Sequence, residues 1–297
     1  MSMSKNKKSI SSSSIKSPLT FNEQLELLKN RNIVVTNKNQ ALEFLKNNNY
    51  YRFTVYALQF REKGEKYKER TKFSTIVNIY NFDKALRRIL FSLLEDFEIS
   101  FKTNLSYHLS HKYGPECYLD KNIFLKNEWY LQFKSALDKN IKKSSNELFI
   151  RHHLNRYEGR FPFWVIVEII PFGAFSKFFN SLNTAEKNDF SRQYYNYGGK
   201  TLSNWVHHFS VVRNICAHYG RLYNKNIFPK LKFLKEDDKN LKSEKVFDTF
   251  FILKKFFYSK LIWDEAENNM EKMLEKYKDS VNIKLIGFPN NWKKILQ

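Results

Sequence analysis

The sequence contains very little cysteine. Cys117 and Cys216 are the only two cysteines among 297 residues, and they lie far apart. A framework of disulfide bridges and a zinc site of paired cysteines are therefore excluded, because both need several closely spaced cysteines. We expect a protein of the reducing cytoplasm, in which Cys216 is simply packed in the core.

Glycine and proline are also sparse, with 8 and 6 residues. The sequence has no glycine-rich phosphate loop, no dinucleotide-binding fingerprint and no HExxH pattern of zinc hydrolases. The adjacent His152 and His153 would point about 100° apart on a helix, which makes a poor metal pair. We therefore expect no cofactor and no metal.

Long apolar runs are missing as well. The most apolar stretch, residues 246–263, is interrupted by one aspartate and three lysines, whereas a membrane-spanning helix needs roughly 18 uncharged residues. Residues 1–18 are rich in Ser and Lys but lack the apolar segment of a signal peptide. They are expected to form a disordered basic tail, and no membrane contact is expected.

Apolar residues at helical spacing, by contrast, are abundant. The chain is 42% hydrophobic and 17% aromatic, which supports a substantial core. The apolar residues recur at steps of three and four, which predicts an all-α protein in which residues 19–297 form a single helical domain. Helices are predicted at residues 22–30, 39–47, 73–111, 127–142, 147–155, 163–170, 174–182, 184–194, 201–220, 243–260 and 264–278, while the aromatic block at 50–56 fits either an extended segment or a tight helix.

The charge balance is strongly basic. Lys and Arg number 51 against 30 Asp and Glu, giving a formal charge of +21. Such a field attracts polyanions such as RNA. The excess is mostly Lys, accompanied by abundant Asn, Ile and Phe, which an AT-rich genome would also produce, so the composition leaves both explanations open.

One segment combines chemically active side chains. Arg213, Asn214 and His218 lie in a helix-patterned run from Thr201 to Asn224, with Ser203 as a possible cap and Gly220 as the expected stop. On a helix Asn214 and His218 lie about 40° apart, whereas Arg213 and His218 lie about 140° apart, so one helix supplies half a site. The alternative is a purely structural role for these residues. Arg213 would pair with a carboxylate on a neighbouring helix, and His218 would lie near a helix C-terminus, where the helix dipole favours its charged form.

Two glutamates could orient that arginine. Glu98 and Glu168 lie within apolar helical stretches, where an inward-facing carboxylate needs a cationic partner. Arg213 is a plausible partner for either.

The same segment carries a family resemblance. RNICAHYGRLYN from Arg213, preceded by the Trp205 of LSNWVHHFSVV, resembles the signature of the Abi-like abortive-infection proteins of bacteria, of the AbiD and AbiF type, in the HEPN superfamily. Further similar blocks occur in the expected order, so that the resemblance covers roughly residues 20–297. Pro171, in place of Ser or Thr, and Lys102, in place of Arg, depart from the usual pattern. The blocks are NNNYYRFTVYALQF from Asn47, IYNFDKALRRILFSLLEDFEISFKTNLSYHLSHKYGP from Ile79, FPFWVIVEIIPFGAFSKFFNSL from Phe161, and GFPNNWKKIL from Gly287.

The resemblance implies a fold and an activity. The fold would be a HEPN-like helical bundle with a core at about residues 73–225 and additional N- and C-terminal helices. The activity would be metal-independent cleavage of RNA in phage defence, by attack of a 2′-hydroxyl on its own phosphate. His218 would move protons, Arg213 would stabilise the charged phosphorane and Asn214 would orient the phosphate or ribose.

Partners follow from the same reasoning. Arg221 and His207 are expected to bind RNA, and Glu98 or Glu168 to hold Arg213. A homodimer is expected, because two motif helices would complete one site, and a regulatory RNA or phage-derived trigger could control it. The alternative is a non-catalytic RNA-binding scaffold or regulator that uses the same fold.

Overall fold

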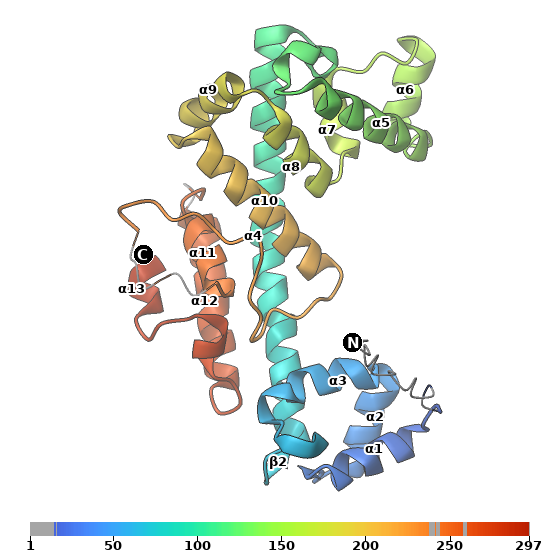
Figure 1. Ribbon diagram of the computed structural model, residues 1–297, viewed down its shortest axis with the longest axis vertical. Helices are drawn as coiled ribbons and strands as arrows, with labels where there is room; N and C mark the ends of the chain where they lie inside the picture. The colour runs from blue at the N-terminus through green and yellow to red at the C-terminus, as the bar shows by residue number, and fades with distance from the viewer. Residues whose placement is uncertain (1–14, 16, 238–240, 242–243, 258–259, 297) are drawn as a thin grey trace, which may run out of the picture. The chain divides into compact units, whose positions relative to one another are not determined.

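The computed structural model describes residues 15, 17–237, 241, 244–257 and 260–296. The predicted all-α fold is confirmed, since α-helices make up most of the described chain (Figure 1). Most of the basic tail expected at residues 1–18 lies outside the described residues. The chain divides into two compact units, residues 1–80 and 81–297.

The first unit contains three short helices that begin at well-formed caps. At the start of α1, Thr20 and Glu23 form a reciprocal capping box, and the side chain of Asn37 caps α2. The aromatic block at 50–56 is helical, and Phe53 stacks on Phe73 with ring centroids 4.4 Å apart. The elements are α1 (Phe21–Asn30), α2 (Lys38–Asn47), α3 (Tyr50–Ala57), and the strands β1 (Ile33–Val34) and β2 (Thr71–Lys72), which pair in parallel.

The long predicted helix is present as α4 (Phe73–Tyr113), and the boundary between the two units falls inside it. It ends at Gly114, whose φ of 86° is open to glycine but costly for other residues. The single domain expected for residues 19–297 stays a prediction, because a continuous helix joins two units that are compact in themselves.

In the second unit, α10 packs on α8 and α9 (Figure 1). Phenylalanine rings join these helices to α4, with Phe97 5.0 Å from Phe209 and Phe101 5.2 Å from Phe179 between ring centroids. Edge-to-face pairs of this kind add to the stability from buried area. The helices after α4 are α5 (Asn127–Lys143), α6 (Leu148–Arg156), α7 (Phe163–Ile169), α8 (Phe172–Ser181), α9 (Thr184–Tyr195), α10 (Gly199–Ala217), α11 (Val246–Lys254), α12 (Lys260–Tyr277) and α13 (Trp292–Leu296).

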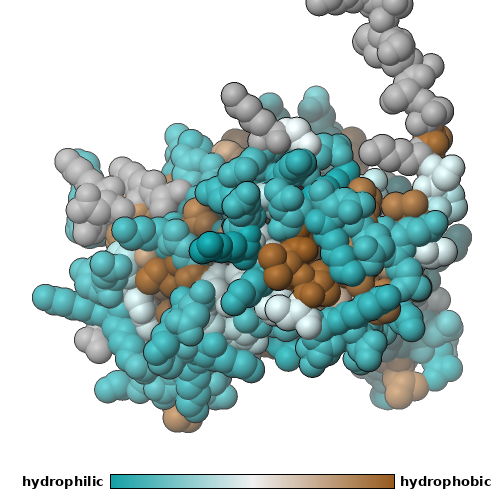
Figure 2. Space-filling model, turned by 90° about the horizontal axis from the view of Figure 1, so that it is seen from below, coloured by the Kyte–Doolittle hydropathy of each residue, from teal (hydrophilic) through white to brown (hydrophobic). Residues whose placement is uncertain are grey.

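One face of the surface is largely polar (Figure 2). On the face drawn in Figure 2, hydrophilic residues cover most of the area, and the hydrophobic ones form small separate patches. None of the helices in the described residues combines the length and the apolar character that crossing a membrane requires.

Candidate functional site at the end of α10

The helix that carries the motif ends earlier than expected. Helix α10 stops at Ala217 and His218 is its C-cap, so the imidazole is on the last turn rather than inside the helix. Gly220 was expected to end the helix, but Tyr219 adopts the left-handed conformation there, with a φ of 59°. Ser203 is not a cap, because α10 begins at Gly199 and Ser203 is buried inside it.

The turn after α10 is a Schellman motif. The backbone N–H of Gly220 donates to the carbonyl of Ile215 at 2.7 Å, and that of Tyr219 donates to Cys216 at 3.2 Å. A Cβ on residue 220 would lie 2.9 Å from Cγ2 of Ile215. Glycine is therefore needed at 220 for close approach, and the turn fixes the backbone next to His218.

A buried ion pair on α4 holds the chain beyond this turn. The carboxylate of Asp83 accepts the backbone N–H groups of Leu222 and Tyr223, at distances of 2.8 to 3.3 Å. Arg87 donates to Asp83 at 2.5 Å and to the carbonyl of Gly220 at 3.2 Å. Both ends of the segment that carries His218 are therefore attached to rigid helices.

Arg213 is held by one of its two expected partners. Its Nε lies 3.1 Å from Oε2 of Glu98, while Nζ of Lys102 lies 2.9 Å from the other carboxylate oxygen. Glu98 is buried and Glu168 is exposed. Among the residues that the structure describes, Glu168 forms no ion pair. The two cations and one carboxylate leave one net positive charge beside the motif.

The amide and the imidazole both lie on the surface, and the amide is next to that charge. Arg213 Nη1 donates to Oδ1 of Asn214 at 3.5 Å, a long contact. Asn214 and His218 are both exposed. The amide nitrogen of Asn214 lies 3.6 Å from the position that a Cβ on Gly173 would take, so the start of α8 borders the site.

The two residues expected to bind RNA lie in different places. Arg221 is half-buried in the segment that Asp83 holds, close in sequence to His218. His207 is exposed and precedes His218 by eleven positions, about 16 Å along a helix axis. His207 instead borders a separate cavity beside three lysines.

Neighbouring groups on α10 have structural rather than reactive character. His208 is buried, and burial lowers its pKa to about 4. The thiol of Cys216 is buried as expected, and burial raises its pKa to about 12, so it is neutral and a poor nucleophile.

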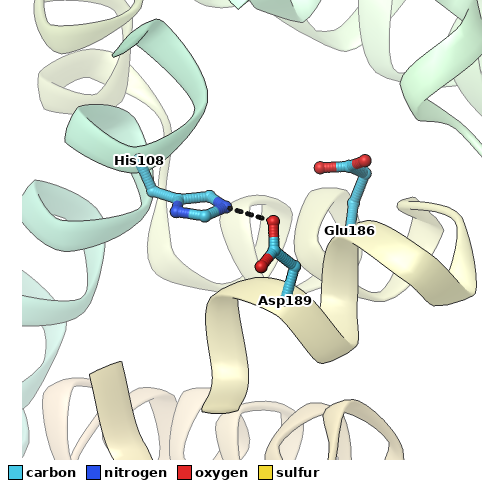
Figure 3. A group of neighbouring side chains, drawn as sticks. All are labelled: His108, Glu186 and Asp189. Atoms are coloured by element: carbon cyan, nitrogen blue, oxygen red, sulfur yellow. Dashed lines mark ion pairs between the residues drawn. The ribbon is translucent and has the colours of Figure 1, made fainter. Parts of the chain in front are cut away.

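A cluster that no sequence pattern indicated joins the end of α4 to α9. Donor atoms of His108, Glu186 and Asp189 lie within 4.8 Å of one another, a spacing that could hold a metal ion (Figure 3). Lys112, however, donates to Asp189 at 2.7 Å and to Glu186 at 3.0 and 3.2 Å. The ammonium already pairs with both carboxylates, although its single charge balances only one of them, so we interpret the cluster as an ion-pair network that fastens the two helices.

The sequence of this chain matches one protein family. The model of the Abi-like protein family matches residues 43–224, a range that includes the whole of α10 and the turn after it. The chain therefore belongs to the Abi-like protein family. No curated protein and no solved structure was found to match it.

Proposed function

We propose that this Abi-like protein is a metal-independent endoribonuclease that acts in defence against phage. The observation that carries the proposal is the arrangement at the end of α10. An arginine oriented by a buried carboxylate contacts an exposed amide, and an exposed imidazole follows at the C-cap of the same helix, where the chain is attached on both sides.

Each group suits one part of transesterification. An imidazole can take a proton from the 2′-hydroxyl and return one to the 5′-oxygen that leaves. The guanidinium can donate two hydrogen bonds to the nonbridging oxygens of the phosphorane. Because Glu98 engages Nε of Arg213, the Nη nitrogens are the ones that remain for Asn214 and for a phosphate.

The complete site is proposed to form between two copies of the chain. Arg213 and Asn214 lie on the last turns of α10, and one chain supplies a single arginine and a single histidine from this motif. The exposed aromatic ring of Tyr219 directly follows His218, and such a side chain can pack against a second copy or against a base. A two-fold symmetric homodimer would bring both motifs to one cleft.

The experiment is an RNA cleavage assay in EDTA with the wild-type protein and the Arg213→Ala and His218→Ala variants. We expect fragments with cyclic phosphate and 5′-hydroxyl ends, at least a hundredfold less of them with either variant, and no cleavage of DNA. A hundredfold loss corresponds to about 3 kcal/mol of transition-state stabilisation. His152→Ala, which removes an exposed ring on α6, is the matched control.

The same assay decides between an enzyme and a scaffold. If all proteins bind RNA and none cuts it, the chain is a binding scaffold. If His218→Ala cuts like the wild type, the proposed role of the imidazole is wrong.

A further inference from the structure

A polar cavity lies on α10, away from the site at the end of that helix. Its volume is about 490 Å³, and its walls come from α8, α9, α10 and the segment around Lys232. This is within the usual size range of ligand sites, roughly 300 to 1,000 Å³. The cavity is therefore large enough for a ligand of several phosphate groups.

The lining of this cavity is cationic. Lys187, Lys200 and Lys232 line it together with His207, and the remaining lining residues are Asn, Ser and Thr without a carboxylate. Within the part of the chain that the structure describes, none of the three ammonium groups forms an ion pair. Three positive charges thus line one cavity, and its described lining residues include no anion to balance them.

The ammonium group of Lys187 is partly desolvated. The residue is half-buried, and burial lowers the pKa of its ammonium group. Its Nζ donates to the backbone carbonyl of Asn180 at 2.9 Å, which is a dipole rather than a charge. A desolvated cation without a counter-ion gains free energy when an anion enters beside it.

Ser203 adds an independent sign of a missing ligand. The residue is 8% exposed, lines the cavity, and its buried Oγ has no hydrogen-bond partner. A buried hydroxyl without a partner costs free energy, so such groups are rare unless a ligand or a water completes them. On turning toward the cavity, this hydroxyl would donate its hydrogen to a phosphate oxygen.

The cavity wall at Lys232 is fixed before any ligand arrives. The side-chain amide of Asn204 donates to the carbonyl of Lys230 at 3.0 Å and accepts the backbone N–H of Lys232 at 2.8 Å. The segment that carries Lys232 is therefore tied to α10. A preformed site loses less conformational entropy when it binds.

We propose that this cavity is a phosphate-binding site for an oligophosphate group. Lys187, Lys200 and Lys232 neutralise the phosphate, the Ser203 hydroxyl donates one hydrogen bond, and His207 stands at the exposed edge. The phosphate comes either from a free nucleotide or polyphosphate, or from an RNA strand. The inference does not depend on cleavage, because binding here needs none of the residues at the end of α10.

The test measures binding with full-length protein that carries His218→Ala, so that RNA stays intact. The probes are sodium tripolyphosphate and a 12-nucleotide RNA, each titrated in 150 mM salt. The site variant is Lys187→Met, Lys200→Met and Lys232→Met together. Its control changes three exposed lysines of α5, Lys134, Lys139 and Lys142, to methionine. Both triple variants fall from a formal charge of +21 to +18 (21 − 3), so bulk charge cannot distinguish them.

We expect the site variant to lose at least tenfold in affinity for one or both probes, and the control to stay within about twofold. Loss for tripolyphosphate alone identifies a free oligophosphate as the ligand, and any loss for RNA places the RNA phosphates in the cavity. Equal losses in the two triple variants, or no measurable loss in the site variant, would overturn the proposal.

Ser203→Ala provides a second, independent test for the case that the triple variant folds poorly. Removing a hydroxyl that has no partner in the unliganded protein should leave the melting temperature unchanged. It should still weaken binding of the same probe by about threefold or more. A lower melting temperature with unchanged affinity would mean that the hydroxyl is structural and would contradict the proposal.

Discussion

At the scale of single residues, the decisive feature is the position of Glu98 between two cations. Its two oxygens receive Arg213 and Lys102 separately, so each cation has its own acceptor. Arg213 also lies over the ring of Phe91, 5.7 Å from its centroid to the guanidinium carbon. The guanidinium plane is thus fixed from two sides, which a surface arginine would lack.

Glu98→Gln is predicted to slow RNA cleavage about tenfold and also to lower stability, because the amide offers one acceptor where the carboxylate offers two. The amide oxygen can still accept a hydrogen bond, but the charge that orients Arg213 is gone, and an imprecise guanidinium stabilises the phosphorane less well. The measurement compares kcat and KM of the variant with those of Lys102→Met, which leaves the Arg213 pair in place. Cleavage by Glu98→Gln at the wild-type rate would mean that Arg213 needs no orienting carboxylate.

From the sequence alone, the carboxylate that pairs with Arg213 could be limited to two glutamates, but the choice between them could not be made. Glu98 and Glu168 occupy equally apolar stretches, but α7 is short and Glu168 turns to solvent on it. Asp83 and Arg87 were missed for a related reason. Helical periodicity indicates which face is apolar, and these two charged residues lie on the buried side because they bind a loop 133 to 140 positions later.

At the scale of elements, the positions of the helices and most of their ends were predictable, whereas the end of α10 was not. With so few Gly and Pro residues, the apolar spacing runs uninterrupted within each helix. The end of α10 depended on Tyr219 taking a left-handed conformation that is rare for a side chain with a Cβ. The pairing of β1 with β2 joins two strands of two residues each, too short for any alternation to show.

Helix α10 is also tied to the elements that follow it, through His208. The carbonyl of Pro229 lies 2.6 Å from Nδ1, and a carbonyl can only accept, so Nδ1 carries the hydrogen. The other ring nitrogen then accepts from the hydroxyl of Thr249, at 2.9 Å. A neutral ring satisfies both contacts, and protonation would put a charge into a buried site.

The stability of the protein is predicted to fall as the pH drops from about 6.5 to about 4. Burial lowers the pKa of His208 to about 4 in the folded protein, from 6.5 in the unfolded chain. Over this window the unfolded chain binds the extra proton, so acid favours unfolding, by up to about 3 kcal/mol in all. Above pH 6.5 both states are neutral and the contribution of His208 is constant.

Urea unfolding at several pH values measures this effect. His208→Gln should be less stable near neutrality but should lose less stability on acidification than the wild type. His152→Ala, on the exposed side of α6, is the control. A His208→Gln curve parallel to that of the wild type would assign the acid sensitivity to other groups.

At the scale of the whole molecule, the net charge could be predicted from the sequence, whereas the division into two units could not. The boundary near Tyr80 lies within a helix whose apolar pattern continues without a break, so no linker marked it in the sequence. The charge of +21 was visible from composition, but composition does not reveal where lysines converge. The structure brings together three of them from positions 187 to 232, which no local pattern could indicate.

The last prediction concerns the assembly of two chains into a homodimer. If a complete site needs His218 from both chains of a dimer, adding inactive chains should suppress activity more than dilution does. With a threefold excess of His218→Ala chains and random exchange, about one sixteenth of dimers would be fully wild type, although one quarter of chains are. Activity should therefore fall well below the fraction of wild-type chains.

The control for this mixing experiment is His152→Ala, whose ring lies on exposed α6, outside the motif. Added in the same excess, active chains of this kind should not suppress cleavage. Sedimentation at the assay concentration tests for the dimer itself. A protein that is monomeric at nanomolar concentration and fully active there, or activity that follows the wild-type fraction linearly, would place a complete site within one chain. Arg213 and His218 of that single chain would then have to reach one phosphate from opposite sides of the end of α10.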